Sequence, residues 1–114
     1  MYDMKNMARL ADLDRAAPQA MAAFNAFGDA AFADGAVPRK YKELIAVAVA
    51  LATQCPYCIE FHTRDARRHG ADDAELAEAA MVSAAIRAGG AVTHAAHLFK
   101  PSPQVNSSPQ AAAK

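Results

Sequence analysis

The sequence predicts an all-α protein of about five helices. Helix-type spacing of apolar residues recurs along most of the chain, and no segment alternates apolar and polar residues as a half-buried strand does. Alanine supplies much of the 54% hydrophobic content, and aromatic residues make up only 7%. Because 114 residues with few large side chains build a modest core, we expect the helices to pack also against copies of the same chain.

The first half of the chain predicts two helices. One is expected over 18–33, with its cap in the region 12–14 and its end before the next glycine and proline. The next is expected over 39–54, directly after Pro38. Residues 44–53 carry no charge, and a helix that is apolar on every side is expected to be buried on every side.

The second half predicts three more helices. A third is expected over 56–69, because Pro56 suits a first helical turn, where its missing N–H would be unpaired anyway. The fourth is expected from a cap at 72–73 to the glycines at 89–90, and a short fifth over 91–99. The fourth helix shows one apolar stripe, made by Leu76, Ala79, Ala80, Ser83 and Ile86.

These elements form one predicted domain over 1–99, followed by a tail over 100–114 whose prolines and small polar residues predict disorder. The N-terminus lacks the pattern of a secretory signal and no segment reaches membrane-spanning length, so we expect a cytoplasmic protein. Lys plus Arg and Asp plus Glu are 12 each, and no basic patch indicates a nucleic-acid partner.

The only two cysteines lie in CPYC, residues 55–58, at a predicted helix start. Free N–H groups and the helix dipole favour a thiolate there, and the thiolate is the reactive form of cysteine. His62 follows Cys58 by four residues, on the same helix face, where it can take the thiol proton or stabilise the negative charge. The spacing therefore predicts a redox pair in which Cys58 has a base and Cys55 completes the disulfide.

Glu43 is the third predicted element of this site. If the helices on either side of Cys55 pack antiparallel, Glu43 lies about 15 Å down one and His62 about 10 Å down the other, at roughly 1.5 Å per residue. Their side chains are then expected to meet, so that the carboxylate orients the histidine and the histidine serves the thiol.

Two other interpretations of the cysteines stay open. They could fill a helix junction as small hydrophobic residues. They could also bind zinc, with His62 and a fourth group such as Glu43 or His94, although no second ligand pair occurs at zinc-finger spacing. His94 and His97 are interpreted mainly as structural or interface residues, with a contribution to the thiol pocket as the lesser alternative. His69, which precedes Gly70, is interpreted as a cation at a helix C-terminus.

The order Glu43, Cys55, Cys58, His62, followed by HGADDAELAEAAMVSAAIRAGGAVTHA, resembles the alkylhydroperoxidase D and carboxymuconolactone decarboxylase family over about residues 20–100. The resemblance implies an all-helical fold that assembles as homotrimers or homohexamers. It also implies that Cys58 is the peroxidatic cysteine and Cys55 the resolving one, with Glu43 and His62 as the proton relay.

The resemblance has one departure and two limits. The founding peroxidase branch has a histidine between its cysteines, where this chain has Tyr57. The decarboxylase branch lacks the cysteine pair, so the resemblance favours a peroxidase over lactone decarboxylation. CPYC also resembles the glutaredoxin motif, but that motif needs surrounding strands, which this sequence does not predict.

The predicted activity is therefore thiol-dependent reduction of hydroperoxides, with no metal and no bound cofactor. An external dithiol on a lipoyl-bearing or thioredoxin-like protein would reduce the disulfide. The alternative is an oligomeric redox sensor or binding protein whose cysteines cycle without turnover, as Tyr57 would permit.

Overall fold

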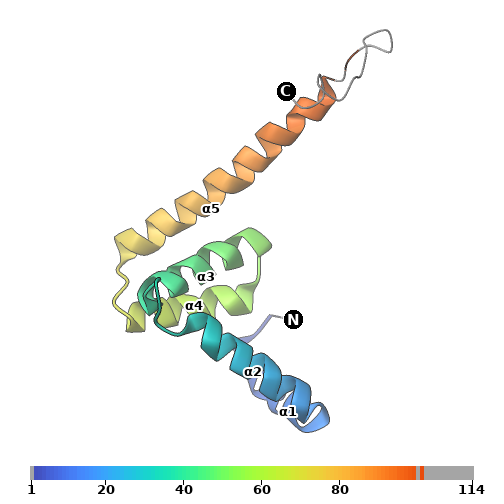
Figure 1. Cartoon of the computed structure of the whole chain (residues 1–114), viewed down its shortest axis with the longest axis vertical. Helices are drawn as coiled ribbons and strands as arrows, with labels where there is room; N and C mark the ends of the chain where they lie inside the picture. The colour runs from blue at the N-terminus through green and yellow to red at the C-terminus, as the bar shows by residue number, and fades with distance from the viewer. Residues whose placement is uncertain (1, 100, 102–114) are drawn as a thin grey trace. The chain divides into compact units, whose positions relative to one another are not determined.

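The computed structural model describes residues 2–99 and 101, and all regular structure in this part of the chain is helical (Figure 1). The predicted all-α fold of about five helices is confirmed. No helix among the described residues is both long and apolar enough to cross a membrane. The elements in chain order are η1 (Met4–Arg9, a 3₁₀ helix), α1 (Leu10–Ala16), α2 (Pro18–Phe32), α3 (Arg39–Thr53), α4 (Pro56–Arg68), α5 (Asp73–His94) and η2 (Ala95–Leu98, also 3₁₀).

The chain before Pro18 forms two short helices that the sequence analysis did not predict. Asp12 and Asp14 lie within α1 and do not cap α2, so the cap expected at 12–14 is wrong. The N-cap of α2 is Ala17, which makes no side-chain capping bond, and Pro18 takes the first helical position. Proline there needs no partner for an N–H, so α2 begins without a polar cap.

Helices α3 and α4 form an antiparallel hairpin and lie side by side (Figure 1). Gln54 ends α3 in the left-handed conformation, with φ 57°. The Cys55 amide donates to the Ala50 carbonyl at 3.0 Å, and Cys55 is already the N-cap of α4. Val47 from α3 and Ala66 from α4 are buried. One residue therefore separates the end of α3 from the cap of α4, which fixes the register of the two helices.

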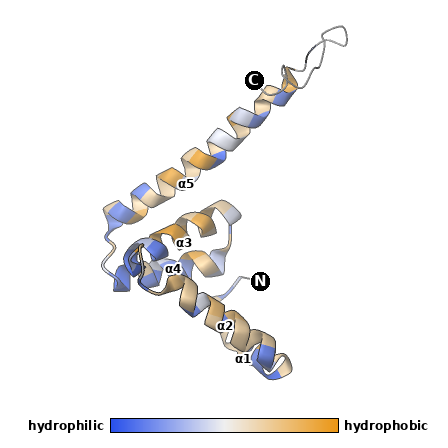
Figure 2. Ribbon diagram, in the orientation of Figure 1, coloured by the Kyte–Doolittle hydropathy of each residue, from blue (hydrophilic) through white to orange (hydrophobic). Residues whose placement is uncertain are grey.

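Helix α3 buries one face only. Hydrophobic residues line much of its length (Figure 2), yet Ile45 is 55% exposed and Val49 56% exposed. The buried face carries Glu43, Val47 and Ala50. The expected burial on every side is thus not met within one chain, because α4 covers a single side of α3.

The α4–α5 junction follows the prediction at both of its ends. Gly70 has φ +96°, which glycine adopts without a Cβ clash, and the helix stops there. Asp72 and Glu75 form a capping box, in which each side chain accepts from the other's backbone N–H, at 2.8 and 3.1 Å. Further along α5, the Ser83 hydroxyl donates to the Ala48 carbonyl of α3 at 2.8 Å.

Helix α5 continues through Gly89 and Gly90 to His94, so the predicted end at these glycines and the separate helix over 91–99 are wrong. A glycine costs a helix about 1 kcal/mol relative to alanine. The segments on either side are rich in alanine, which favours the helix and offsets that cost. Two glycines therefore weaken this helix without ending it.

The chain divides into two compact units, with the boundary between Ala84 and Ala85 inside α5. The single domain over 1–99 stays a prediction. In the second unit, His94 Nδ1 lies 2.8 Å from the Gly90 carbonyl, and the His94 and His97 rings are 5.9 Å apart. The predicted disordered tail over 100–114 lies outside the described residues, apart from Pro101.

Candidate active site

The two cysteine sulfurs lie in contact at the start of α4, with Sγ atoms 2.6 Å apart. Both are free thiols and both are half-buried. The Cys58 amide also donates to Cys55 Sγ at 3.3 Å, because Cys55 is the N-cap and its sulfur takes the place of a capping oxygen. A disulfide between the two therefore requires little movement of either residue.

The contact separates the acidities of the two thiols. The sulfur–sulfur hydrogen bond with Cys58, aided by the amides of Cys58 and Tyr57, lowers the pKa of Cys55. The same bond, together with burial and the negative charge of Cys55, raises the pKa of Cys58. The two shifts have opposite directions, so the contact favours a thiolate on Cys55 over one on Cys58 in the reduced pair.

Glu43 and His62 meet across the hairpin, as the helix geometry predicts, with Glu43 Oε1 2.7 Å from His62 Nδ1. The Glu43 side chain is 0% exposed and that of His62 is 21% exposed. Because the carboxylate occupies Nδ1, Nε2 is the ring nitrogen left for a thiol or a substrate. His62 lies one helical turn beyond Cys58, and both line the same two cavities.

Arg39 and Phe32, which the sequence did not indicate as site residues, link Glu43 to His62 by a second set of contacts. Arg39 Nε donates to the other Glu43 oxygen, Oε2, at 2.7 Å. The Arg39 guanidinium lies 5.5 Å from the centre of the Phe32 ring, and Phe32 stacks on His62 with 5.1 Å between ring centroids and 7° between planes. Arg39 lies four residues before Glu43, which is an ion-pair spacing that the sequence contains. Phe32 belongs to another helix and gives no local signal.

Two cavities reach Cys58 and His62. The larger, about 270 Å³, is mostly apolar, and its lining residues are Phe32, Ala46, Val49, Ala50, Thr53, Cys58 and His62. The smaller, about 140 Å³, is lined by Met7, Tyr57, Cys58, Phe61 and His62. Neither lining contains Asp, Glu, Lys or Arg, so both cavities suit an uncharged molecule.

The donor atoms near His62 fit a hydrogen-bonded relay better than a metal centre. Atoms of Glu43, His62 and Asp65 lie within 4.8 Å of one another, but neither cysteine sulfur joins such a group among the described residues. The cysteine and histidine zinc site considered above therefore does not assemble in that part of the chain. Both Glu43 oxygens already bond to Arg39 or His62. The positive charge of the Arg39 guanidinium also disfavours binding of a metal cation at the same carboxylate.

The profile of the Carboxymuconolactone decarboxylase family matches residues 18–101. The chain belongs to this family. All four predicted site residues lie within the matched range: Glu43, Cys55, Cys58 and His62. The η1 segment and α1 precede it.

Two relatives of this family member are similar in sequence. "Uncharacterized protein 4 in cox locus" of Paracoccus denitrificans is 48% identical over 91 residues, which span 80% of this chain and 82% of that protein. An uncharacterized protein of Cupriavidus necator is 45% identical over 71 residues, 62% of this chain and 63% of its own.

Solved structures show the same fold. A carboxymuconolactone decarboxylase family protein from Legionella pneumophila, solved in its apo form, superposes with a TM-score of 0.71 at 36% identity, over 81% of this chain and 82% of that one. A protein from Methanobacterium thermoautotrophicum gives a TM-score of 0.72, also at 36% identity, over 75% and 97%. The helical architecture described above is therefore shared with these proteins.

Proposed function

We propose that this member of the family is a thiol-dependent hydroperoxide reductase. The observation that carries the proposal is the contact between Cys55 and Cys58 at the start of α4, one helical turn from a histidine whose Nδ1 is held by a buried carboxylate. A nucleophile, a base and a group that orients the base are the parts that such a reaction needs.

In the first step the Cys58 sulfur attacks the terminal oxygen of ROOH. His62 Nε2 takes the thiol proton, the O–O bond breaks, and the alkoxide RO⁻ leaves as ROH with that proton. Cys58 becomes a sulfenic acid, and the peroxide is reduced by two electrons. Glu43 holds the ring in the tautomer with a free Nε2 and stabilises the imidazolium that forms.

In the second step the Cys55 thiolate attacks the sulfenic sulfur, the S–O bond breaks, and the hydroxide that leaves takes a proton from solvent and becomes water. The lowered pKa of Cys55 supports this resolving role, because a thiolate is available at the adjacent sulfur. An external dithiol then exchanges with the disulfide and restores both thiols. A lipoyl-bearing or thioredoxin-like protein is the proposed donor.

The decisive test is stopped-flow consumption of an organic hydroperoxide by the dithiothreitol-reduced protein, with free thiols counted before and after. The expected result is loss of two thiols per chain for each peroxide consumed. Two stable thiols and no consumption would contradict the reductase and favour a redox sensor or binding protein whose cysteines do not turn over.

Two serine variants test the separate roles. Cys58→Ser should abolish consumption, whereas Cys55→Ser should consume one equivalent and leave a sulfenic acid on Cys58 that dimedone traps. The opposite pattern would assign the attack on peroxide to Cys55, and unchanged turnover in both would exclude the pair. Circular dichroism and solution mass should match the unmodified protein in each case.

A further inference from the structure

The N-terminal segment lies outside the range that the family profile matches, yet it contacts the candidate site. Residues 2–7, called here the strap, include the first turn of η1. Asp3 caps that turn, with its Oδ1 accepting from the Lys5 amide at 2.9 Å. The segment thus has a defined local conformation and is not a loose end at this site.

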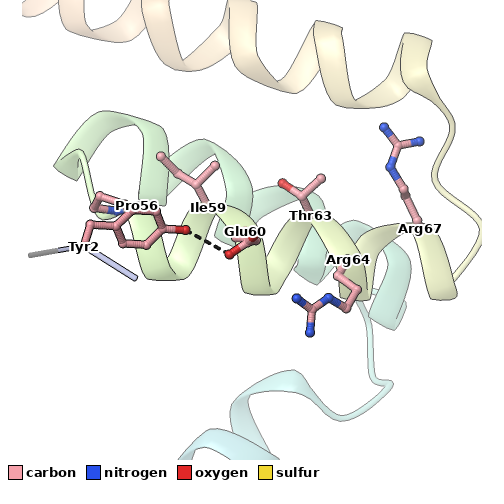
Figure 3. A pocket seen from close by; sticks show the side chains of 7 residues that line it. All are labelled: Tyr2, Pro56, Ile59, Glu60, Thr63, Arg64 and Arg67. Atoms are coloured by element: carbon pink, nitrogen blue, oxygen red, sulfur yellow. Dashed lines mark hydrogen bonds between the residues drawn. The ribbon is translucent and has the colours of Figure 1, made fainter. Parts of the chain in front are cut away.

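The strap is fastened to α4 at two points. Tyr2 donates its hydroxyl to Glu60 Oε2 at 2.9 Å (Figure 3), and its ring lies edge-on to Tyr57 with centroids 4.8 Å apart. Asn6 Nδ2 donates to the Tyr57 hydroxyl at 2.9 Å. The bond to Glu60 raises the pKa of Tyr2 above the ordinary tyrosine value, which is consistent with a hydroxyl that donates to a carboxylate.

The strap therefore contacts Tyr57 at two places, the ring and the hydroxyl. The ring meets Tyr2 and the hydroxyl meets Asn6. This tyrosine stands between the two cysteines, where the sequence gives no histidine. Its contacts are those of an anchor for the strap.

Met7, the last residue of the strap, reaches the candidate site itself. Its side chain is half-buried and lines the smaller cavity, together with Cys58 and His62. A methionine side chain is long and flexible, and it fills irregular space closely. The strap thereby supplies one wall of the site beside the reacting sulfur.

We propose that the strap is a size-limiting wall of the thiol site, with Tyr57 as its anchor and Met7 as its specificity-determining residue. On this side Cys58 admits small uncharged hydroperoxides and rejects bulky ones. The inference deepens the proposed function, because it names the substrate class, but its geometric basis is independent of turnover.

The first experiment measures access to Cys58 directly, in a Cys55→Ser background. Alkylation by iodoacetamide is compared with alkylation by fluorescein maleimide. Met7→Ala should raise the rate with the bulky reagent about tenfold and leave the rate with the small one within about twofold, since a few methylene groups in a pocket change discrimination by that order. Lys5→Ala, an exposed change on the same segment, should alter neither rate.

A second variant removes the two hydrogen bonds between the strap and α4 and keeps both Tyr57 and Met7. Tyr2→Phe with Asn6→Ala should raise the bulky-reagent rate in the same direction, because both hydrogen bonds to α4 are lost. Equal acceleration of both reagents in the two variants, or no change in either, would overturn the inference.

The corresponding peroxide readout is the ratio of kcat/KM for tert-butyl hydroperoxide to that for cumene hydroperoxide. Met7→Ala should lower this ratio about tenfold. An unchanged ratio in an active enzyme would overturn the role of Met7. If the protein consumes no peroxide while the alkylation selectivity holds, the proposed function fails and the strap stands.

Discussion

Glu43 is a fully buried carboxylate with a separate partner for each oxygen. Burial of an unpaired charge is costly, and loss of one partner of a buried pair is strongly destabilising. Arg39 and His62 together bond both oxygens, while Phe32 joins the arginine to the histidine ring. The proposed relay is therefore also a structural unit, and its variants are expected to change both stability and reactivity.

Arg39→Gln should lower the free energy of unfolding by about 2 kcal/mol, in the range measured for hydrogen bonds to charged groups. The Arg39 side chain is 34% exposed, which keeps the expected loss below that of a fully buried pair. Urea denaturation followed by circular dichroism measures it. Arg15→Gln is the matched control, since its pair with Asp12 is exposed on both sides and should contribute less than about 1 kcal/mol.

Glu43→Gln should raise the pH needed to alkylate Cys58. The amide cannot stabilise an imidazolium as a carboxylate does, so His62 becomes a weaker partner for the thiol. The pH profile of iodoacetamide labelling in a Cys55→Ser background measures the change. The groups that surround His62 in this experiment are Arg39, Glu43, Tyr57, Cys58 and Asp65. A profile that overlays that of the parent protein would remove Glu43 from the relay.

The sulfur contact gives a prediction of its own. Since the Cys58 thiol lowers the pKa of Cys55, Cys55 should be alkylated at lower pH than Cys58 in the reduced protein. Cys58→Ala removes the hydrogen-bond partner of Cys55 and should move the Cys55 midpoint upward, toward an ordinary thiol. Peptide mass spectrometry distinguishes the two sites. Alkylation of Cys58 before Cys55 would contradict the order of acidity that the contact implies.

The sequence predicts that Glu43 and His62 meet and that the two cysteines lie together, because spacing along two adjacent helices determines these contacts. Glu43 and His62 are brought together by the hairpin, as expected, and their catalytic roles stay predictions. Phe32 and Met7 reach the site from elements outside that hairpin. Apolar periodicity describes each helix alone. It therefore cannot indicate which side chain from a distant segment covers the part of the site that the hairpin leaves open.

At the scale of the elements, helix ends were predicted well where backbone geometry demands a residue type. Gly70 has φ +96°, and Asp72 caps α5 within the predicted range 72–73, with Glu75 as a capping-box partner that was not predicted. The positions of Gly89 and Gly90 do not require glycine, because both residues have ordinary helical geometry within α5. The short helices before Pro18 were missed because they carry too few apolar repeats to show a period.

Gly70→Ala should lower the free energy of unfolding by about 1 kcal/mol, because a Cβ is disfavoured at positive φ. Gly28→Ala is the matched control in the interior of α2, where an added Cβ meets nothing within 4 Å. That change should raise the free energy of unfolding by about 0.5–1 kcal/mol. Denaturant titrations of the two variants should move in opposite directions, and a stabilised Gly70→Ala would contradict the strain argument.

At the scale of the whole molecule, large apolar side chains are exposed on several helices. Phe24 and Phe27 on α2 are 63% and 70% exposed, and Ile45 and Val49 on α3 are more than half exposed. Scattered exposed apolar residues are ordinary, but a helix face of this kind is typical of a surface that another chain covers. We therefore propose that the protein assembles with itself, as a homotrimer or a homohexamer.

Light scattering during size-exclusion chromatography should give three or six times the chain mass of 12.0 kDa. Ile45→Glu introduces a charge on the exposed face of α3 and should lower the mass toward one chain while the helical circular dichroism spectrum is kept. A mass of one chain for the unmodified protein at micromolar concentration would contradict the assembly.

Gln54 and Cys55 fix which residues of α3 and α4 lie opposite one another, so the spacing of the site residues along the chain determines their contacts. The two helices are joined without a longer loop, since the αL residue Gln54 is followed directly by the N-cap of α4. Each residue inserted between Glu43 and Gln54, or between Cys55 and His62, would rotate the far side chain by about 100° around its helix axis. Such an insertion would separate the carboxylate from the imidazole without altering either one. Interval lengths along this hairpin are thus as much a requirement of the chemistry as the four side chains themselves.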